Sequence, residues 1–139
     1  MLVSDAVGAT LTDLGADTVF GVVGSGNFHV TNALITRGAR FYAARHEGGA
    51  ACMADGWARA AGRPSLLSVH QGPGLTNALT GITEAAKSRT PLVVLAADVA
   101  GAAVRSNFRI DVASIAAAVG AVAERLHSPG SAAADTARA

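Results

Sequence analysis

Hydrophobic residues along the chain follow two alternating patterns, one typical of helices and one typical of buried strands. Between residues 3 and 14 the apolar positions recur three or four residues apart, which predicts an amphipathic helix that ends at Gly15. A continuous apolar and β-branched run follows at 18–23 and predicts a buried parallel strand. The same change from helical to strand pattern recurs along the chain.

Later segments extend this alternation. We expect strands at 40–43, 65–69 and 92–96, helices at 29–36, 47–61, 75–88 and 111–119, a last edge strand at 122–126 and the start of a helix at 131–139. Since strands and helices alternate, the predicted fold class is α/β. The expected architecture is an open parallel sheet with helices on both faces, in a flavodoxin-like layering.

The composition and net charge of the chain limit the kinds of partner that we expect it to bind. The chain has 139 residues, which suits one domain, and its net charge is +1 with the basic residues scattered. No basic strip interleaved with aromatic residues indicates a nucleic-acid partner. No apolar run approaches the roughly 20 residues of a membrane helix, and the N-terminus does not resemble a signal peptide. We therefore expect a soluble, cytoplasmic protein with no membrane partner.

Cys52 is the only cysteine, so we expect no disulfide framework and assign no metal ligands. It lies at helical spacing with Gly48, Gly56 and Ala60, on a helix face with almost no side chains. This face either packs closely on the sheet of the same chain or admits a second subunit, and both interpretations stay open. In either case we expect Cys52 to serve as a small, buried residue and not as a reactive thiol.

Polar residues follow three of the predicted strands. Ser25, Glu47 and His70 each come after a strand, and the carboxyl ends of parallel strands share one edge of a sheet, where ligands bind. The two glycines after Glu47 leave room for another molecule. The alternative is that Glu47 only complements a helix dipole. The glycine-containing segment at 72–74 is likewise either a tight turn or a surface on which a flat ligand lies.

The glycine clusters do not match nucleotide-binding motifs. The spacing at 21–26 differs from the dinucleotide fingerprint, and no P-loop lysine follows either cluster. A flavodoxin-like nucleotide-binding protein is therefore the least favoured interpretation.

Several separated motifs resemble the N-terminal pyrimidine-binding domain of thiamine-diphosphate enzymes, in the acetolactate synthase and benzoylformate decarboxylase group. The motifs lie at 45–51, 54–59 and 72–78, with further support at 89–95. The resemblance covers about residues 2–126 and implies thiamine diphosphate as the cofactor. It also implies Mg²⁺, held by a diphosphate-binding domain whose Gly-Asp-Gly motif this chain lacks. FAD occurs in such enzymes but is not indicated here.

The resemblance implies roles for particular residues. The family's glutamate at the position of Glu47 hydrogen-bonds the aminopyrimidine ring and promotes the imino tautomer that takes the proton from the thiazolium carbon. Glu47 is thus the expected catalytic residue. The implied cofactor-binding residues are Glu47, Gly72, Pro73, Gly74 and Asn77.

The same resemblance places substrate beside Ser25, Gly26, His70 and Gln71, and we hypothesise that Arg109 binds a substrate carboxylate. Acetolactate synthases more often carry a small hydroxyl residue and a serine at the positions of His70 and Gln71. They also carry Phe-Gln where this chain has Phe108 and Arg109. These departures argue against assigning acetolactate synthesis itself.

The implied parent enzyme decarboxylates a 2-oxo acid, with or without joining the product to an acceptor carbonyl, as a homodimer or homotetramer. We expect residues 1–139 to be a pyrimidine-binding domain truncated at its C-terminal end and inactive alone, or else the corresponding subunit of a two-chain decarboxylase. The alternative from another class is a non-catalytic binding or assembly module. Glu47 argues against that module, because packing alone does not require this acid.

Overall fold

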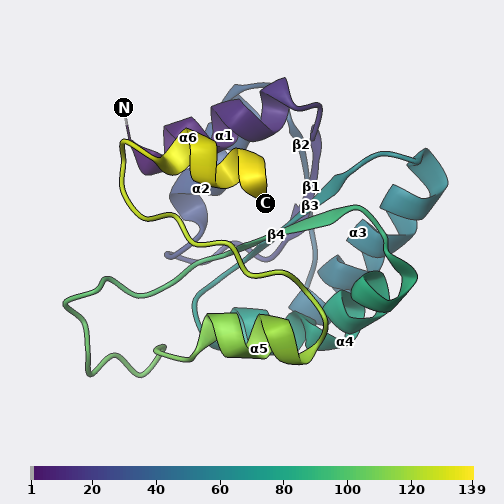
Figure 1. The fold of residues 1–139 in the computed structure, drawn as a ribbon. Helices are drawn as coiled ribbons and strands as arrows, with labels where there is room; N and C mark the ends of the chain where they lie inside the picture. Colours follow the sequence, from purple (N-terminus) through teal and green to yellow (C-terminus); the bar gives the residue numbers. More distant parts are fainter. Residues whose placement is uncertain (1) are drawn as a thin grey trace.

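Four parallel strands form one sheet in the computed structural model, which describes residues 2–139. The strands are β1 (Thr18–Gly21), β2 (Arg40–Ala43), β3 (Ser65–Val69) and β4 (Leu92–Ala96). Helices α1 (Val3–Asp13), α2 (Phe28–Thr36) and α6 (Ala132–Arg138) lie on one face of the sheet (Figure 1). Helices α3 (Glu47–Ala61), α4 (Pro73–Ser88) and α5 (Val112–Ala118) lie on the other. The predicted α/β class is confirmed.

The strand order is β2-β1-β3-β4, so the chain moves outward in one direction after β1 and in the other direction after β3. Val19 of β1 is in register with Phe41 of β2 on one side and with Leu66 of β3 on the other. The order therefore reverses between β1 and β3. In open parallel sheets the loops that leave such a pair of strands separate and form a ligand-binding crevice at the carboxyl edge.

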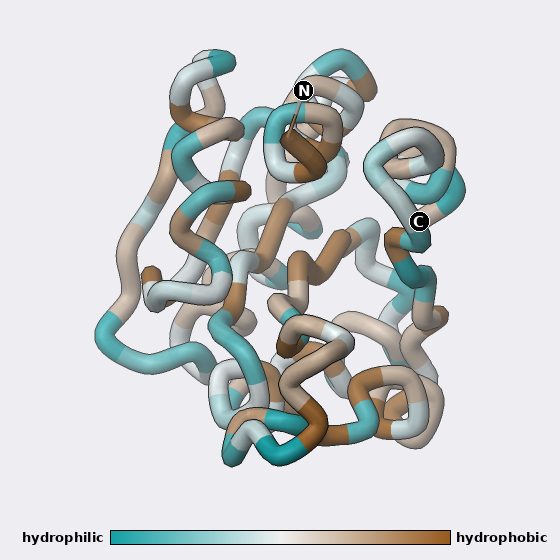
Figure 2. The backbone as a smooth tube through the Cα atoms, turned by 90° about the vertical axis from the view of Figure 1, so that its left-hand side faces the viewer, coloured by the Kyte–Doolittle hydropathy of each residue, from teal (hydrophilic) through white to brown (hydrophobic). Residues whose placement is uncertain are grey.

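Each face of the sheet has its own hydrophobic core, because successive strand residues point to opposite sides. Val19 and Leu66 pack with α1 and α2, whereas their neighbours Phe20 and Leu67 pack with α3 and α4. Figure 2 shows strongly hydrophobic stretches in the interior of the molecule and many hydrophilic segments at its periphery. The buried strands are thus apolar on both faces, as parallel sheets require.

Helices α3 and α4 approach each other closely through small residues. A Cβ atom added to Gly81 of α4 would lie only 2.5 Å from the Cβ of Ala51 of α3. The buried residues of α3 include four alanines, at positions 50, 51, 54 and 58. Any larger side chain in this stripe would push α3 away from α4 or from the sheet.

Because the alanine stripe of α3 faces inward, the small-residue face with Cys52 faces solvent. Cys52, Gly56 and Ala60 are exposed. The prediction that Cys52 is buried is therefore wrong, and so is the interpretation that this face packs on the sheet of the same chain. The inner contacts are made instead by Ala50, Ala54 and Ala58, each two positions before a residue of the exposed face. The interpretation as a contact with a second subunit stays a prediction.

The predicted edge strand at 122–126 is also wrong. This segment pairs with no strand in residues 2–139, and Val122 is 95% exposed. Both β4 and the segment line a cavity of about 360 Å³. Side-chain contacts hold the segment instead, since Glu124 accepts from Arg138 at 2.8 Å and Arg125 lies 3.7 Å from Asp98.

The last helix, α6, begins one residue later than predicted and packs against α1 (Figure 1). Over the described part of the chain, none of the helices is long and apolar enough to cross a membrane.

Candidate functional site

Glu47 lies in the first turn of α3, at the carboxyl edge of the sheet. The preceding residue, His46, is extended, and its Nδ1 accepts a 3.0 Å hydrogen bond from the backbone N–H of Gly48, which caps the helix. Glu47 is half-buried, and its Oε2 accepts a 3.0 Å hydrogen bond from Nδ2 of Asn77 in α4. The position suits a helix-dipole contact, but the bond to Asn77 also fixes one carboxylate oxygen from a second helix.

The start of α4 depends on glycine for conformation and for space. Gly72 caps the helix with a positive φ of 59°, which favours glycine, and Pro73 follows as the first helical residue. A Cβ at Gly72 would lie 2.7 Å from the carbonyl oxygen of Phe108. One at Gly74 would lie 3.2 Å from Cβ of His70 and 3.6 Å from Oε1 of Glu47. A Cβ at Gly74 would therefore contact both side chains, and its absence leaves a gap of about the size of a methyl group next to them.

His70 follows β3 and is held by the loop that follows β1. The backbone N–H of Gly26 donates to its Nδ1 at 3.1 Å, and its ring meets that of Phe108 edge to face with centroids 5.2 Å apart. A Cβ at either Gly24 or Gly26 would come within 2.8 Å of the imidazole. The two loops at the strand-order reversal are thus packed against each other around His70.

The remaining predicted residues of this edge are less enclosed. Ser25 is exposed at the tip of the loop after β1, next to Gly26. Gln71 is half-buried, and its Nε2 donates to the carbonyl oxygen of Asp98 at 2.9 Å. The structure therefore brings the loops of Ser25, His70 and Glu47 to one edge, as expected from the strand order.

Arg109 is placed elsewhere. Its exposed side chain lines a cleft of about 500 Å³ together with Asp98, Asp111 and Arg125. Neither Glu47 nor His70 lines this cleft. The neighbouring residue, Phe108, contacts His70, so the backbone passes the site while the guanidinium lies in the separate cleft.

Asn27 is a residue of this edge that the sequence motifs did not single out. It is completely buried, and its Oδ1 accepts from the backbone N–H of Gly24 at 2.7 Å. Its Nδ2 donates to the carbonyl oxygen of Val22 at 3.1 Å and to Oγ of Ser68 at 3.0 Å. The available signal was an asparagine directly after a short glycine-rich turn, a place where its amide can replace backbone partners.

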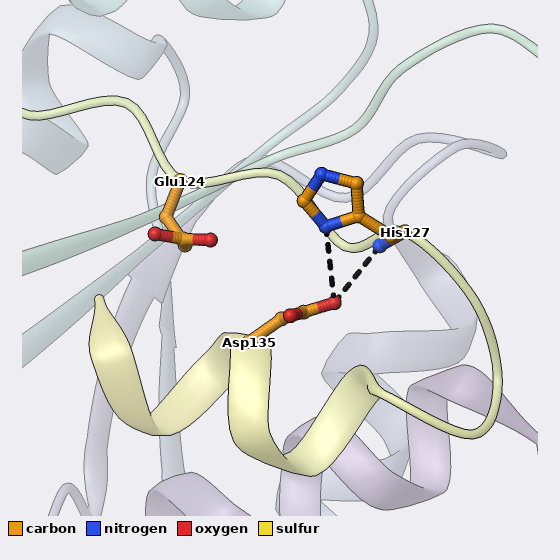
Figure 3. A group of neighbouring side chains, drawn as sticks. All are labelled: Glu124, His127 and Asp135. Atoms are coloured by element: carbon orange, nitrogen blue, oxygen red, sulfur yellow. Dashed lines mark hydrogen bonds and ion pairs between the residues drawn. The ribbon is translucent and has the colours of Figure 1, made fainter.

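A second cluster of polar side chains lies near the C-terminus (Figure 3). Glu124, His127 and Asp135 each offer a ligand atom, and these atoms lie within 4.8 Å of one another. Arg138 already contacts both carboxylates. Oδ2 of Asp135 also accepts from the backbone N–H of His127 at 2.9 Å and from Oγ of Ser131 at 2.7 Å. The guanidinium supplies the positive charge that a metal would otherwise bring, so we interpret the cluster as an attachment of α6 to the preceding segment.

Comparisons with known proteins point to one family. Residues 1–124 match the sequence pattern of the family described as "Thiamine pyrophosphate enzyme, N-terminal TPP binding domain". The large subunit of acetolactate synthase isozyme 3 from Escherichia coli is 43% identical over 98 residues, which is 70% of this chain and 17% of that protein.

Two further relatives carry other activities in their names. A probable 2-ketoarginine decarboxylase from Pseudomonas aeruginosa is 42% identical over 61% of this chain and 15% of its own length. A sulfoacetaldehyde acetyltransferase from Rhodobacter capsulatus is 36% identical over 68% of this chain and 16% of its own length. The chain thus spans only about a sixth of these relatives.

A solved structure has the same fold. The X-ray structure of a putative thiamin diphosphate-dependent enzyme isolated from Mycobacterium smegmatis superposes with a TM-score of 0.70 at 29% identity, and the match covers 78% of this chain and 21% of that one.

Proposed function

This chain belongs to the thiamine pyrophosphate enzymes, as their N-terminal TPP-binding domain, and we propose that it holds the pyrimidine half of the cofactor with Glu47 as the proton partner of the ring. The single observation that supports the proposal best is the arrangement of Glu47, Asn77 and Gly74 at the carboxyl edge of the sheet. A carboxyl group is fixed there by one oxygen, beside a gap that a glycine leaves open.

The donor and acceptor set fits an aminopyrimidine. Oε2 of Glu47 is taken by Asn77, while Oε1 has no hydrogen-bond partner among residues 2–139 and lies toward Gly74. A ring nitrogen needs one such carboxyl oxygen, and a flat ring needs the space that a Cβ at Gly74 would fill. Gly72 and Pro73 fix the start of α4 and so the position of this gap.

Thiamine diphosphate, when bound, supplies the electron sink for breaking or forming a bond next to a carbonyl carbon. Glu47 contributes a proton that it shares with a ring nitrogen, and this exchange is efficient only when the acid is held at hydrogen-bond distance. Asn77 keeps the carboxyl group in that orientation. Of the two glycines that follow Glu47, Gly49 faces open space, whereas a Cβ at Gly48 would lie 3.2 Å from the carbonyl oxygen of Asn77, so Gly48 permits the close approach of α3 to α4.

We infer that the substrate is a 2-oxo acid bound beside Ser25, Gly26, His70 and Gln71. The name of one relative, 2-ketoarginine decarboxylase, denotes this class of substrate, and another relative is named for acetyl transfer. The first name fits a parent enzyme that cleaves a 2-oxo acid, and the second fits transfer of the two-carbon fragment to an acceptor. Arg109 would reach a substrate carboxylate only if its side chain left the cleft it now lines.

Mg²⁺ and the diphosphate group, in this proposal, are bound by another domain, because the chain carries no Gly-Asp-Gly motif. We also propose that the exposed small-residue face of α3, at Cys52, Gly56 and Ala60, is where two such domains meet in a homodimer. Small side chains permit close helix approach, which supports the assignment.

A calorimetric titration with separate halves of the cofactor tests the proposal. We expect the chain to bind 4-amino-5-hydroxymethyl-2-methylpyrimidine without Mg²⁺ and to bind magnesium pyrophosphate no better than buffer. Thiamine diphosphate should then gain little from added Mg²⁺. Preferential binding of magnesium pyrophosphate, or binding of none of the three compounds, would contradict the proposal and favour a non-catalytic assembly module.

A further inference from the structure

Asn27 has no role in the proposed chemistry, yet it is the most completely satisfied buried polar side chain at the edge of the sheet. Its oxygen and both of its amide hydrogens are used, on Gly24, Val22 and Ser68. Ser68 in turn shares a 3.0 Å hydrogen bond with the hydroxyl of Thr31 in α2. Because the amide is fully buried, loss of any one of these bonds leaves a polar group without water.

The network fixes the conformation of residues 22–27. Two of the three bonds of Asn27 go to the backbone of this same loop, and the third ties the loop to β3 through Ser68. The loop therefore has a defined position relative to His70, which follows β3 directly. That position places the N–H of Gly26 3.1 Å from Nδ1 of His70.

A backbone N–H can only donate, so Nδ1 of His70 must be the acceptor and carry no hydrogen in this arrangement. In a neutral imidazole the proton then belongs to Nε2. This Nδ1 contact is the one hydrogen bond of the His70 ring among the residues that the structure describes, so Nε2 has no partner there.

We propose that Asn27 is a positioning residue that, through the N–H of Gly26, holds His70 in the Nε2–H tautomer and leaves this N–H free to donate to a ligand at the carboxyl edge. Gly24 and Gly26 contribute by shape, since a Cβ at either position would come within 2.8 Å of the ring. Phe108 closes another side of the ring.

The donation of a hydrogen bond from Nε2–H to a bound ligand rests on the proposed function, but the tautomer of His70 does not depend on it. It is measured in the ligand-free chain, from the pattern of two-bond couplings between ring nitrogens and ring protons, at a pH where the imidazole is neutral. The signals of His70 are assigned by their loss in His70→Asn. If the chain failed to bind the cofactor, the measured tautomer of His70 would still stand. Likewise, an unexpected tautomer would not contradict cofactor binding.

We expect the wild-type ring to be almost entirely the Nε2–H tautomer. In Asn27→Ala the tautomer ratio should move about fivefold toward Nδ1–H, which is the effect of losing one neutral hydrogen bond. Ser68→Ala, which removes the bond that ties the loop to β3 and the bond to Thr31 but keeps both bonds within the loop, should give a smaller shift in the same direction. Ser65→Ala is the matched control, because Ser65 is equally buried but donates to Ala54 and not to this loop.

A wild-type ring in the Nδ1–H form would overturn the proposal. So would an unchanged ratio in a folded Asn27→Ala. If Asn27→Ala does not fold, Ser68→Ala decides, since an unchanged ratio in that variant would equally contradict the role of the network.

Discussion

Nδ2 of Asn77 donates a 3.0 Å hydrogen bond to Oε2 of Glu47, although the two residues belong to different helices. The bond joins the first turn of α3 to the first turns of α4. It fixes one oxygen of the carboxyl group and turns the other toward the gap at Gly74. The orientation of the proposed proton partner therefore depends on a residue that does not itself exchange the proton.

Replacing Asn77 with alanine should impair ligand binding more than folding. Asn77 is exposed, so we expect the free energy of unfolding to change by less than about 0.5 kcal/mol. The affinity for the aminopyrimidine alcohol should fall about threefold to tenfold, because one hydrogen bond that orients Glu47 is lost. Calorimetry measures the affinity, and Thr76→Ala on the same exposed turn serves as the control. Equal affinity in both variants would mean that Glu47 is oriented by other means.

Two glycine-to-alanine substitutions should change stability in opposite directions. Gly81→Ala places a Cβ 2.5 Å from that of Ala51 and should lower the free energy of unfolding by about 1–3 kcal/mol. Gly56→Ala meets nothing within 4 Å on an exposed helix face and should raise it by about 0.5–1 kcal/mol. Urea denaturation followed by circular dichroism measures both, and a shift of the same sign in both variants would refute the described packing of α3 on α4.

The attachment of α6 should be lost in acid. Hydrogen bonds from the backbone N–H of His127, from Ser131 and from Arg138 hold the pKa of Asp135 well below its ordinary value. The bond from Arg138 likewise lowers the pKa of Glu124. A depressed pKa stabilises the folded form above the ordinary pKa of about 3.9, and this stabilisation is lost as the pH falls through the lower folded value.

Amide hydrogen exchange in α6 tests this expectation between about pH 5 and pH 2. After correction for the intrinsic exchange rate, protection should decrease toward the acid end in the wild type. Asp135→Asn should have low protection throughout and little change with pH. Acid-dependent protection that persists unchanged in Asp135→Asn would show that other groups hold the helix.

Self-association through α3 should be sensitive to one exposed position. Gly56→Leu adds a bulky side chain to the small-residue face and should convert a dimer into a monomer in sedimentation velocity. Ala134→Leu, an exposed substitution on α6 across the sheet, should leave the sedimentation coefficient unchanged. A dimer that tolerates Gly56→Leu would exclude this face as the contact.

Much of the fold could be predicted because strands and helices here differ strongly in local pattern. The apolar run that ends at Val69, the glycine that caps α4 and the proline at its first position specify a strand, a turn and a helix without tertiary information. The segment at 122–126 could not be placed in this way. A strand also needs a neighbouring strand to pair with, and this segment pairs with none in residues 2–139 but lines a cavity together with β4.

The candidate site, too, could be predicted from the sequence only in part. The position of Glu47 after a strand predicted the edge at which it lies, because parallel strands share their carboxyl ends. The partners of individual atoms depend on contacts between distant segments, such as Gly26 with His70 across 44 residues. The exposure of Cys52 also depended on which of two small stripes of α3 meets α4, and both stripes have the same helical period.

The measurement that tests the central claim most directly is a titration of Glu47→Gln with 4-amino-5-hydroxymethyl-2-methylpyrimidine, the aminopyrimidine alcohol used above. Binding is monitored through the amide chemical shifts. In the wild type we expect shifts at Glu47, Gly74 and Asn77, with binding at least about tenfold weaker in Glu47→Gln because the amide cannot share a proton with the ring. Glu84→Gln makes the same chemical change on the exposed surface of α4 and should bind as the wild type does. Equal binding by Glu47→Gln and the wild type would contradict the role of Glu47 as the proton partner.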